Sequence, residues 1–158
     1  MSSRNGVSDH HIHPTSRGGL NVPENKVCQS ARKHAIYHIL FYNLIPEEIV
    51  ECLNRDYWSN RYYIAIERKC DKLCYDLETC GEASIRKREI PSAKEQFAYS
   101  LLFNGMTPEM VLTYLAEEWW GSQFNVFIFR RENSRVNQKE ELFNRIFEPV
   151  GSKVKAPT

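Results

Sequence analysis

The sequence predicts a mainly α fold with minor β, built from two pseudo-symmetric helix-turn-helix-strand repeats that pack as one compact unit. Three observations lead to this prediction: an internal repeat, apolar residues spaced three and four apart in each copy, and an aromatic, β-branched segment that follows. The chain has 158 residues, 42% of them hydrophobic, which is enough for the core of one domain.

The repeat emerges when the sequence is shifted against itself by 62 positions, which aligns residues 31–69 with residues 93–131 without a gap. Ten of the 39 aligned pairs are identical, including Tyr37 with Tyr99 and Trp58 with Trp120. The identities fall on apolar positions and on a Pro-Glu step, where packing and helix initiation constrain the sequence most. Two copies indicate a pseudo-two-fold pair that shares one core, not a solenoid.

Each copy begins with an amphipathic helix that ends near Asn43 or Gly105, because these residue types tolerate the left-handed conformation common at helix ends. A second helix starts at Pro46 or Pro108, a favourable first helical residue, and Thr107 is a good cap for the second copy. The apolar face of this helix pair predicts a core that includes the repeated tryptophans.

The segments at 62–66 and 124–129 are aromatic and β-branched, which favours strands, although short apolar runs leave an all-helical version open. A further helix is expected at 138–147. The predicted organisation is therefore a disordered tail at 1–26, repeat 1 at 27–69, a Cys-containing basic linker at 70–92, repeat 2 with the C-terminal helix at 93–149, and a tail at 150–158.

The N-terminal region contains the sequence His-His-Ile-His at residues 10–13. The tract is either a metal-binding segment or part of a solvated tail, and its surroundings, rich in Ser, Gly, Asn and Pro with almost no large apolar side chains, favour the tail. Cys70, Cys74 and Cys80 form the one cysteine cluster, but their spacing differs from that of common zinc sites, which favours reduced thiols. The sequence therefore assigns no metal and no cofactor.

Charge argues against a uniformly basic nucleic-acid coat, since 21 basic residues face 20 acidic ones. The basic residues are nevertheless segregated, because residues 96–125 contain three acids and no base. Two helices joined by a short turn, followed by arginines, favour a helix-turn-helix protein that binds double-stranded DNA. Solubilising charge at exposed strand ends is the alternative explanation of the same pattern.

The predicted function is a DNA-binding transcriptional regulator of bacterial, phage or mobile-element type, and the alternative is a non-enzymatic adaptor that binds other proteins. The two basic strand ends are expected to act together as one DNA-contacting surface. The expected DNA-binding residues are Arg55, Arg61, Arg68, Lys69, Arg86, Lys87, Arg88, Arg130, Arg131 and Arg135.

Known catalytic patterns are absent from the sequence, which has no phosphate-cradling glycine loop, no H-E-x-x-H and no glycine-flanked serine nucleophile, so no enzyme is predicted. Charges interrupt every hydrophobic run, which excludes a stretch of the roughly 20 apolar residues of a membrane span. The polar N-terminus lacks the apolar core of a secretory signal, and a cytoplasmic location is expected.

Part of the second copy resembles the FlhD subunit of the bacterial FlhDC transcriptional activators. The resemblance lies in GMTPEMV at 105–111, LAE at 115–117 and FIFR at 127–130. It implies a DNA-binding activator that works with a partner subunit, and a homodimer is the other assembly considered.

Overall fold

The computed structural model describes residues 6–69, 75–84 and 90–131. Within these residues the chain forms four α-helices and six strands, and the strands pair into three small antiparallel sheets. The fold is therefore α/β, and the prediction of a mainly α fold is wrong. The additional strands come from the N-terminal region and from the segment after repeat 1, whose polar composition predicts a tail and a linker instead.

The two copies contain the same elements at a constant spacing of 62 residues. In each copy the second helix is followed by a π-helical turn, an uncommon element that occurs at equivalent positions in both. The first copy consists of α1 (Ala31–Phe41), α2 (Pro46–Cys52), η2 (Leu53–Tyr57) and β4 (Tyr62–Arg68), and the second of α3 (Ala93–Leu102), α4 (Pro108–Tyr114), η3 (Leu115–Trp119) and β6 (Phe124–Arg130).

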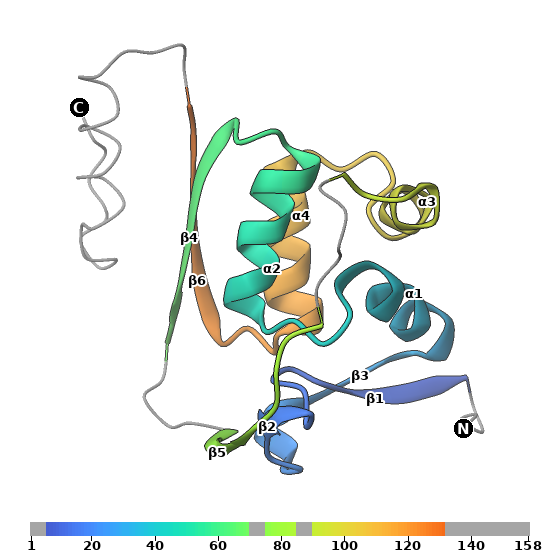
Figure 1. The fold of residues 1–158 in the computed structure, drawn as a ribbon, viewed down its shortest axis with the longest axis vertical. Helices are drawn as coiled ribbons and strands as arrows, with labels where there is room; N and C mark the ends of the chain where they lie inside the picture. Colours follow the sequence, from blue (N-terminus) through green and yellow to red (C-terminus); the bar gives the residue numbers. More distant parts are fainter. Residues whose placement is uncertain (1–5, 70–74, 85–89, 132–158) are drawn as a thin grey trace.

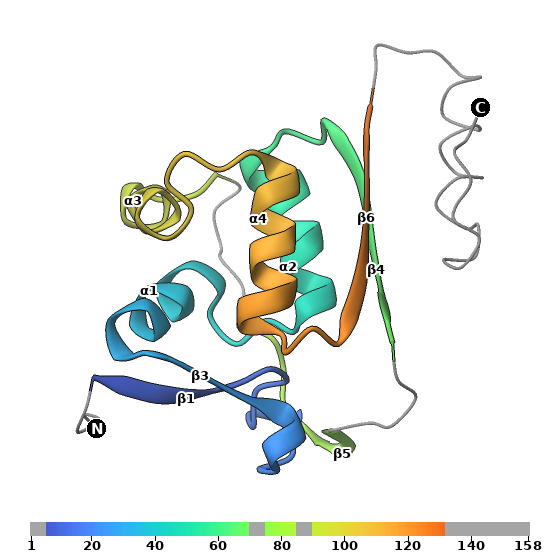
Figure 2. The same cartoon turned by 180° about the vertical axis from the view of Figure 1, so that it is seen from behind.

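Strands β4 and β6 form an antiparallel ribbon in which Tyr62 pairs with Arg130 and Arg68 pairs with Phe124. Ala65 pairs with Phe127, its own equivalent in the other copy, so the pseudo-two-fold axis passes between these two residues. Helices α2 and α4 lie side by side between the ribbon and the pair α1 and α3 (Figures 1 and 2). The helices cover one face of the ribbon, and this face packs against the core through Ile64, Ile66, Val126 and Ile128.

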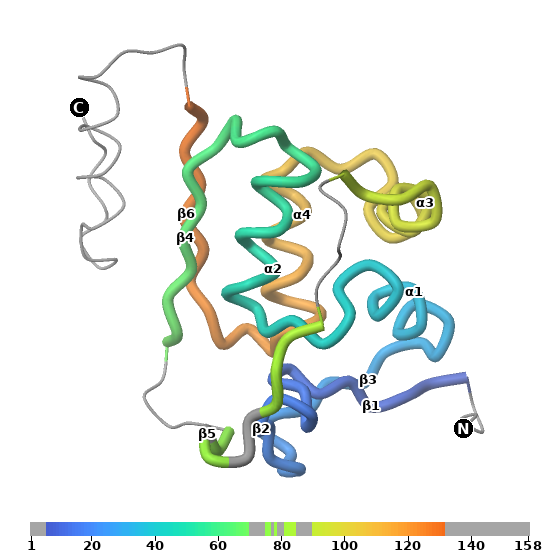
Figure 3. Tube along the Cα trace, viewed as in Figure 1, coloured from blue at the N-terminus to red at the C-terminus, as the bar shows by residue number. Residues whose placement is uncertain are grey.

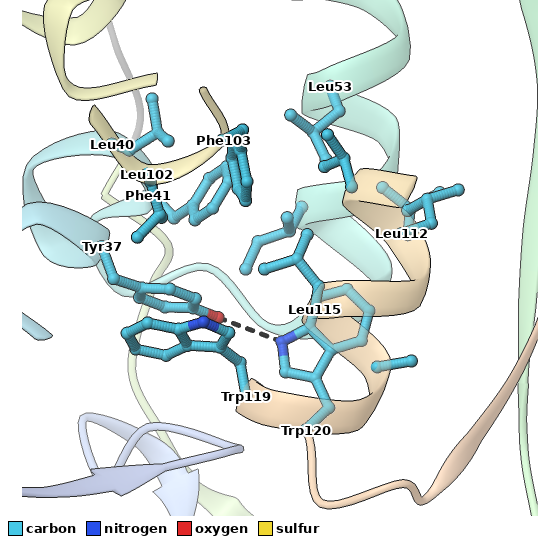
Figure 4. Packing of buried hydrophobic residues seen from close by; sticks show 14 of the residues in the cluster. Tyr37, Leu40, Phe41, Leu53, Leu102, Phe103, Leu112, Leu115, Trp119 and Trp120 are labelled. Atoms are coloured by element: carbon cyan, nitrogen blue, oxygen red, sulfur yellow. Dashed lines mark hydrogen bonds between the residues drawn. The ribbon is translucent and has the colours of Figure 1, made fainter. Parts of the chain in front are cut away.

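Reciprocal contacts join the copies across this axis. The indole of Trp58 donates a hydrogen bond to Tyr99 Oη at 2.9 Å, and the indole of Trp120 donates to Tyr37 Oη at 3.1 Å (Figure 4). Tyr57 stacks on Tyr99 at 4.9 Å between ring centroids, as its counterpart Trp119 stacks on Tyr37 at 4.5 Å. All three tryptophans are buried, which confirms their predicted place in the core.

The N-terminal region folds against this core, contrary to the expectation of a disordered tail. Strand β1 (Val7–His11) pairs with β3 (Lys26–Ser30), and between them lie β2 (Arg17–Gly19) and a 3-10 turn, η1 (Pro23–Asn25). The tube in Figure 3 shows this hairpin beside α1. Strand β2 pairs antiparallel with β5 (Tyr75–Cys80). Ile12 inserts into the main core, so the hairpin is part of the domain.

Some sequence-based predictions lie outside the described residues, namely the helix at 138–147, the C-terminal tail, Cys70 and Cys74. Cys80 ends β5, and its side chain is likewise not described. In the part of the chain that is described, no helix combines the length and apolar composition needed to cross a bilayer.

Candidate metal centre

Three histidines from two elements meet beside the hairpin. His10 comes from β1, and His34 and His38 lie one turn apart on α1, so they share one face of the helix. One ring nitrogen of each lies within 4.8 Å of the others. His10 is buried, His34 is half-buried and His38 is exposed, so the cluster extends from the core to the surface.

His10 is the buried end of this cluster, with only 1% of its surface exposed. Its ring packs against Tyr37 at 4.6 Å and Trp119 at 5.2 Å, and neither of its two nitrogens has a hydrogen-bond partner among the described residues. Burial, with His34, His38 and His11, lowers the pKa of His10 to about 2, so the imidazole is neutral at physiological pH. A neutral imidazole with an unpaired nitrogen is the form that binds a metal ion.

Hydrogen bonds orient the other two rings. His38 Nδ1 lies 2.9 Å from the carbonyl oxygen of Tyr42, which only accepts, so Nδ1 carries the proton and the lone pair is on Nε2, which faces His34. His34 Nδ1 contacts Ser8 Oγ at 2.6 Å, and the Nε2 atoms of His34 and His38 lie 3.0 Å apart. Burial lowers the pKa of His34 as well, which favours its neutral form.

This donor set fits a divalent first-row ion. Two nitrogens bound to a tetrahedral zinc ion lie about 3.3 Å apart; the Nε2 atoms of His34 and His38, at 3.0 Å, are near this spacing, whereas the set with His10 spans up to 4.8 Å and would contract around an ion. Imidazole ligands suit Zn²⁺, Ni²⁺ and Cu²⁺, and three of them leave a coordination position for water or substrate. Such an open position is typical of catalytic ions, whereas structural zinc usually has four protein ligands.

His11 follows His10 on β1, and its charge lowers the pKa of both His10 and His34, less than burial does. Its Nε2 is 3.2 Å from Asn21 Oδ1, which only accepts, so His11 donates from Nε2 and offers the lone pair of Nδ1. A half-buried imidazole held in one tautomer can accept a proton from a water molecule. His11 is not among the three histidines whose nitrogens converge, which makes it a candidate general base and not a fourth ligand.

Asn25 holds the loop that precedes β3. Its side-chain oxygen accepts from the backbone N–H of His13 at 2.9 Å, and its amide donates to the carbonyls of His13 and Leu20, each at 2.9 Å. These three bonds satisfy buried polar groups that secondary structure leaves unpaired. They fix the path of the chain between β1 and β3, and with it the position of His10 and His11.

Arg17 ties the same loop to repeat 1. Its guanidinium binds both carboxylate oxygens of Glu48, at 2.8 and 2.9 Å, and also contacts the carbonyl of Asn43 at 3.3 Å. The carboxylate of Glu48 also accepts from the backbone N–H of Ile45, the residue that precedes α2. This bond caps the start of the helix, because the side chain of Ile45 has no hydrogen-bond acceptor. The hydrogen bonds from Arg17 are the main cause of a lowered pKa for Glu48.

Replacing Glu48 with glutamine is expected to lower the free energy of unfolding by about 1 kcal/mol at pH 7, after allowance for solvent screening. The lowered pKa means that the stabilisation is complete above the ordinary value of 4.5 and is lost as the pH falls through the lower, folded-state value. Urea unfolding between pH 7 and pH 3 should therefore show the two proteins converging at acid pH. The exposed Glu51, replaced in the same way, is the control, and a constant difference at every pH would contradict the role of the ion pair.

The predicted DNA-binding arginines do not gather at this centre. Arg68 faces inward, with its Nε 3.3 Å from Glu47 and its guanidinium over the rings of Tyr75 and Phe124. Arg55 pairs with Asp56, and Arg131 stacks on Tyr63 at 4.0 Å. The exposed residues of the predicted set are Arg55, Arg61, Lys69, Arg130 and Arg131, whereas Arg86, Lys87, Arg88 and Arg135 lie outside the described residues.

The two basic strand ends lie at opposite ends of the ribbon, because Arg68 pairs with the first residue of β6 and Arg130 with the first residue of β4. At about 3.4 Å per residue, the seven-residue strands separate these ends by roughly 20 Å. The basic ends are therefore related by the pseudo-two-fold axis but do not form one continuous cluster.

The site that sequence reasoning missed is the histidine cluster. All five histidines of the chain fall between residues 10 and 38, and two of them are spaced i, i+4 on a helix. That spacing places two ligands on one face and could have connected the N-terminal tract to α1. Comparisons of the chain with protein families, with curated proteins and with solved structures find no match.

Proposed function

We propose that the protein is a metal-dependent hydrolase that cleaves phosphodiester bonds of nucleic acid. His10, His34 and His38 would bind the ion, and His11 would take a proton from the attacking water. The observation that carries the proposal is the buried, unpartnered imidazole of His10 facing two further histidines whose Nε2 atoms converge. A bound ion would take the lone pair of one unpartnered His10 nitrogen and stabilise charge on a phosphate oxygen.

The surroundings favour a large, anionic substrate. The cluster extends from the buried His10 to the exposed His38, so it opens at the surface of the molecule. An open centre of this kind suits an extended polymer better than a small molecule, which usually binds in an enclosed pocket. Arg32 and Lys33 are exposed in the first turn of α1, directly before His34, and could contact phosphates.

In this proposal the DNA that the sequence predicts the protein to bind is its substrate. A DNA-binding regulator that does not cleave, and a protein-binding adaptor, remain the alternatives. A cytoplasmic location and assembly with a second copy or a partner subunit also remain predictions.

The test combines metal, substrate and one variant. Metal-free protein is incubated with duplex DNA, single-stranded DNA or RNA in the presence of Mg²⁺, Mn²⁺, Co²⁺, Ni²⁺ or Zn²⁺, with casein as the peptide substrate. We expect metal-dependent cleavage of at least one nucleic acid and none of casein. The His11→Ala variant should keep its affinity for the ion and cleave about 10²- to 10⁴-fold more slowly, the usual contribution of a general base.

Three results would contradict this function in different ways. Cleavage by His11→Ala at the wild-type rate would remove the general base. Binding of an ion without cleavage of any nucleic acid would contradict the proposed hydrolase activity. DNA binding that ignores the ion and leaves the DNA intact would favour the regulator, and its affinity should then fall steeply with salt.

A further inference from the structure

Tyr42 directly follows α1 and holds His38 at two points. Its backbone N–H donates to the carbonyl of His38 at 2.9 Å, and its own carbonyl accepts from the Nδ1 of the same residue at 2.9 Å. This arrangement requires φ 53° and ψ −129°, a conformation that residues with a side chain rarely adopt. Such backbone persists only where neighbouring structure holds it in place.

The second copy provides that restraint. The phenolic hydroxyl of Tyr42 donates to the carboxylate of Glu95 in the first turn of α3. Glu95 is 3% exposed, and its other oxygen accepts from the backbone N–H of Ser92 at 2.8 Å. The hydroxyl of Ser92 in turn accepts from the N–H of Glu95, so a reciprocal capping box fixes the carboxylate.

The contact departs from the internal symmetry. The reciprocal Trp–Tyr bonds occur twice, once from each copy, but the equivalent of Glu95 in the first copy is Lys33 and the equivalent of Tyr42 in the second copy is Asn104. The positions of His34 and His38 are likewise taken by Gln96 and Ser100 in the second copy. The Tyr42–Glu95 contact therefore exists only on the side of the molecule that carries the histidine cluster.

We propose that Tyr42 and Glu95 are positioning residues for the metal centre, through which the second repeat fixes the orientation and tautomer of His38. The Glu95 carboxylate anchors the Tyr42 side chain, the anchored side chain holds the unusual backbone, and the backbone carbonyl keeps the proton on Nδ1 and the lone pair of Nε2 toward the ion. This inference rests on the metal centre proposed above. Outer-shell partners of this kind commonly change metal affinity by about 10- to 100-fold.

The experiment compares Tyr42→Phe with Tyr99→Phe in the full chain. Each variant loses one hydroxyl that bonds between the two copies, but Tyr99 binds Trp58 and is not in contact with a histidine of the cluster. Co²⁺ binding is followed by calorimetry and by visible absorption, whose intensity reports coordination geometry. We expect Tyr42→Phe to weaken Co²⁺ binding by about 10-fold and to alter the spectrum, and Tyr99→Phe to bind as the wild type does.

Each other outcome is decisive. Equal weakening in both variants would mean that the hydroxyl of Tyr42 acts only through stability, which overturns the inference, as would wild-type affinity and spectrum in Tyr42→Phe. A wild-type protein that binds no Co²⁺ would overturn the metal centre and this inference together. Where Tyr42→Phe does not fold, Glu95→Gln keeps an acceptor for Ser92; it should weaken binding in the same direction, and unchanged binding would again overturn the inference.

Discussion

Replacing His34 with alanine is expected to weaken binding of Zn²⁺ or Ni²⁺ by more than about 100-fold, since loss of an outer-shell partner alone can cost up to that much. The variant removes one of three nitrogens that converge within 4.8 Å, and the remaining two cannot complete the centre. Its folding should change only modestly, because the half-buried ring loses hydrogen bonds to Ser8 and to the exposed His38, each worth about 1 kcal/mol. Calorimetric titration of metal-free protein measures the effect.

Trp119 gives a second measurement, because its ring centroid lies 5.2 Å from that of His10. A paramagnetic ion such as Cu²⁺ bound at the cluster should quench its fluorescence in the wild type but not in His34→Ala. Gln96→Ala is the matched control, since Gln96 is exposed at the equivalent position of the second copy. Unchanged affinity in His34→Ala would show that the ion binds elsewhere.

Of the variants proposed for this protein, Gly19→Ala should lower the free energy of unfolding most, by roughly 3 kcal/mol or more, the range of severe steric overpacking. A Cβ at this position would lie 1.7 Å from the carbonyl oxygen of His13 and 2.9 Å from that of Pro14, both backbone atoms. The backbone of His13 cannot move aside without breaking its bonds to Asn25. We expect the hairpin to detach and metal affinity to fall with it.

Gly6→Ala separates this steric effect from backbone strain. Gly6 has φ +72°, but no atom lies within 4 Å of the place that an alanine methyl group would take, so alanine there should cost only about 1 kcal/mol. Denaturant unfolding compares the two variants, and metal titration reports the hairpin. Similar losses in both would mean that the approach to His13 is not the constraint at Gly19.

The repeat could be predicted from sequence because it depends on periodic apolar positions. The pairs Leu53/Leu115 and Trp58/Trp120 are core residues in both copies, and each predicted strand begins where the aromatic segment begins. The starts of α2 and α4 could be predicted from Pro46 and Pro108, because proline favours the first turn of a helix. These signals depend on neighbouring residues alone, so the elements that they predict are the ones found in the structure.

The hairpin and the metal centre depend on contacts that local patterns do not encode. The 7–30 region contains few large apolar residues, and its stability comes from Asn25, from the Arg17–Glu48 pair and from side chains of the second copy. Gln123 and Gln29 bind backbone carbonyls across more than 80 residues of sequence. Polar composition therefore suggested disorder where tertiary hydrogen bonds impose order.

The reciprocal pairing of the two copies determines when the centre can form during synthesis. The ligands His10, His34 and His38 leave the ribosome early, but the hairpin that carries His10 packs against Trp119 and Gly121, and β4 has no partner strand until β6 is made. About 90 residues separate His38 from the end of β6, which takes roughly 5–20 s at common elongation rates. Through that interval the nascent first copy exposes its half of the core, so the histidines are translated first and the centre is completed last.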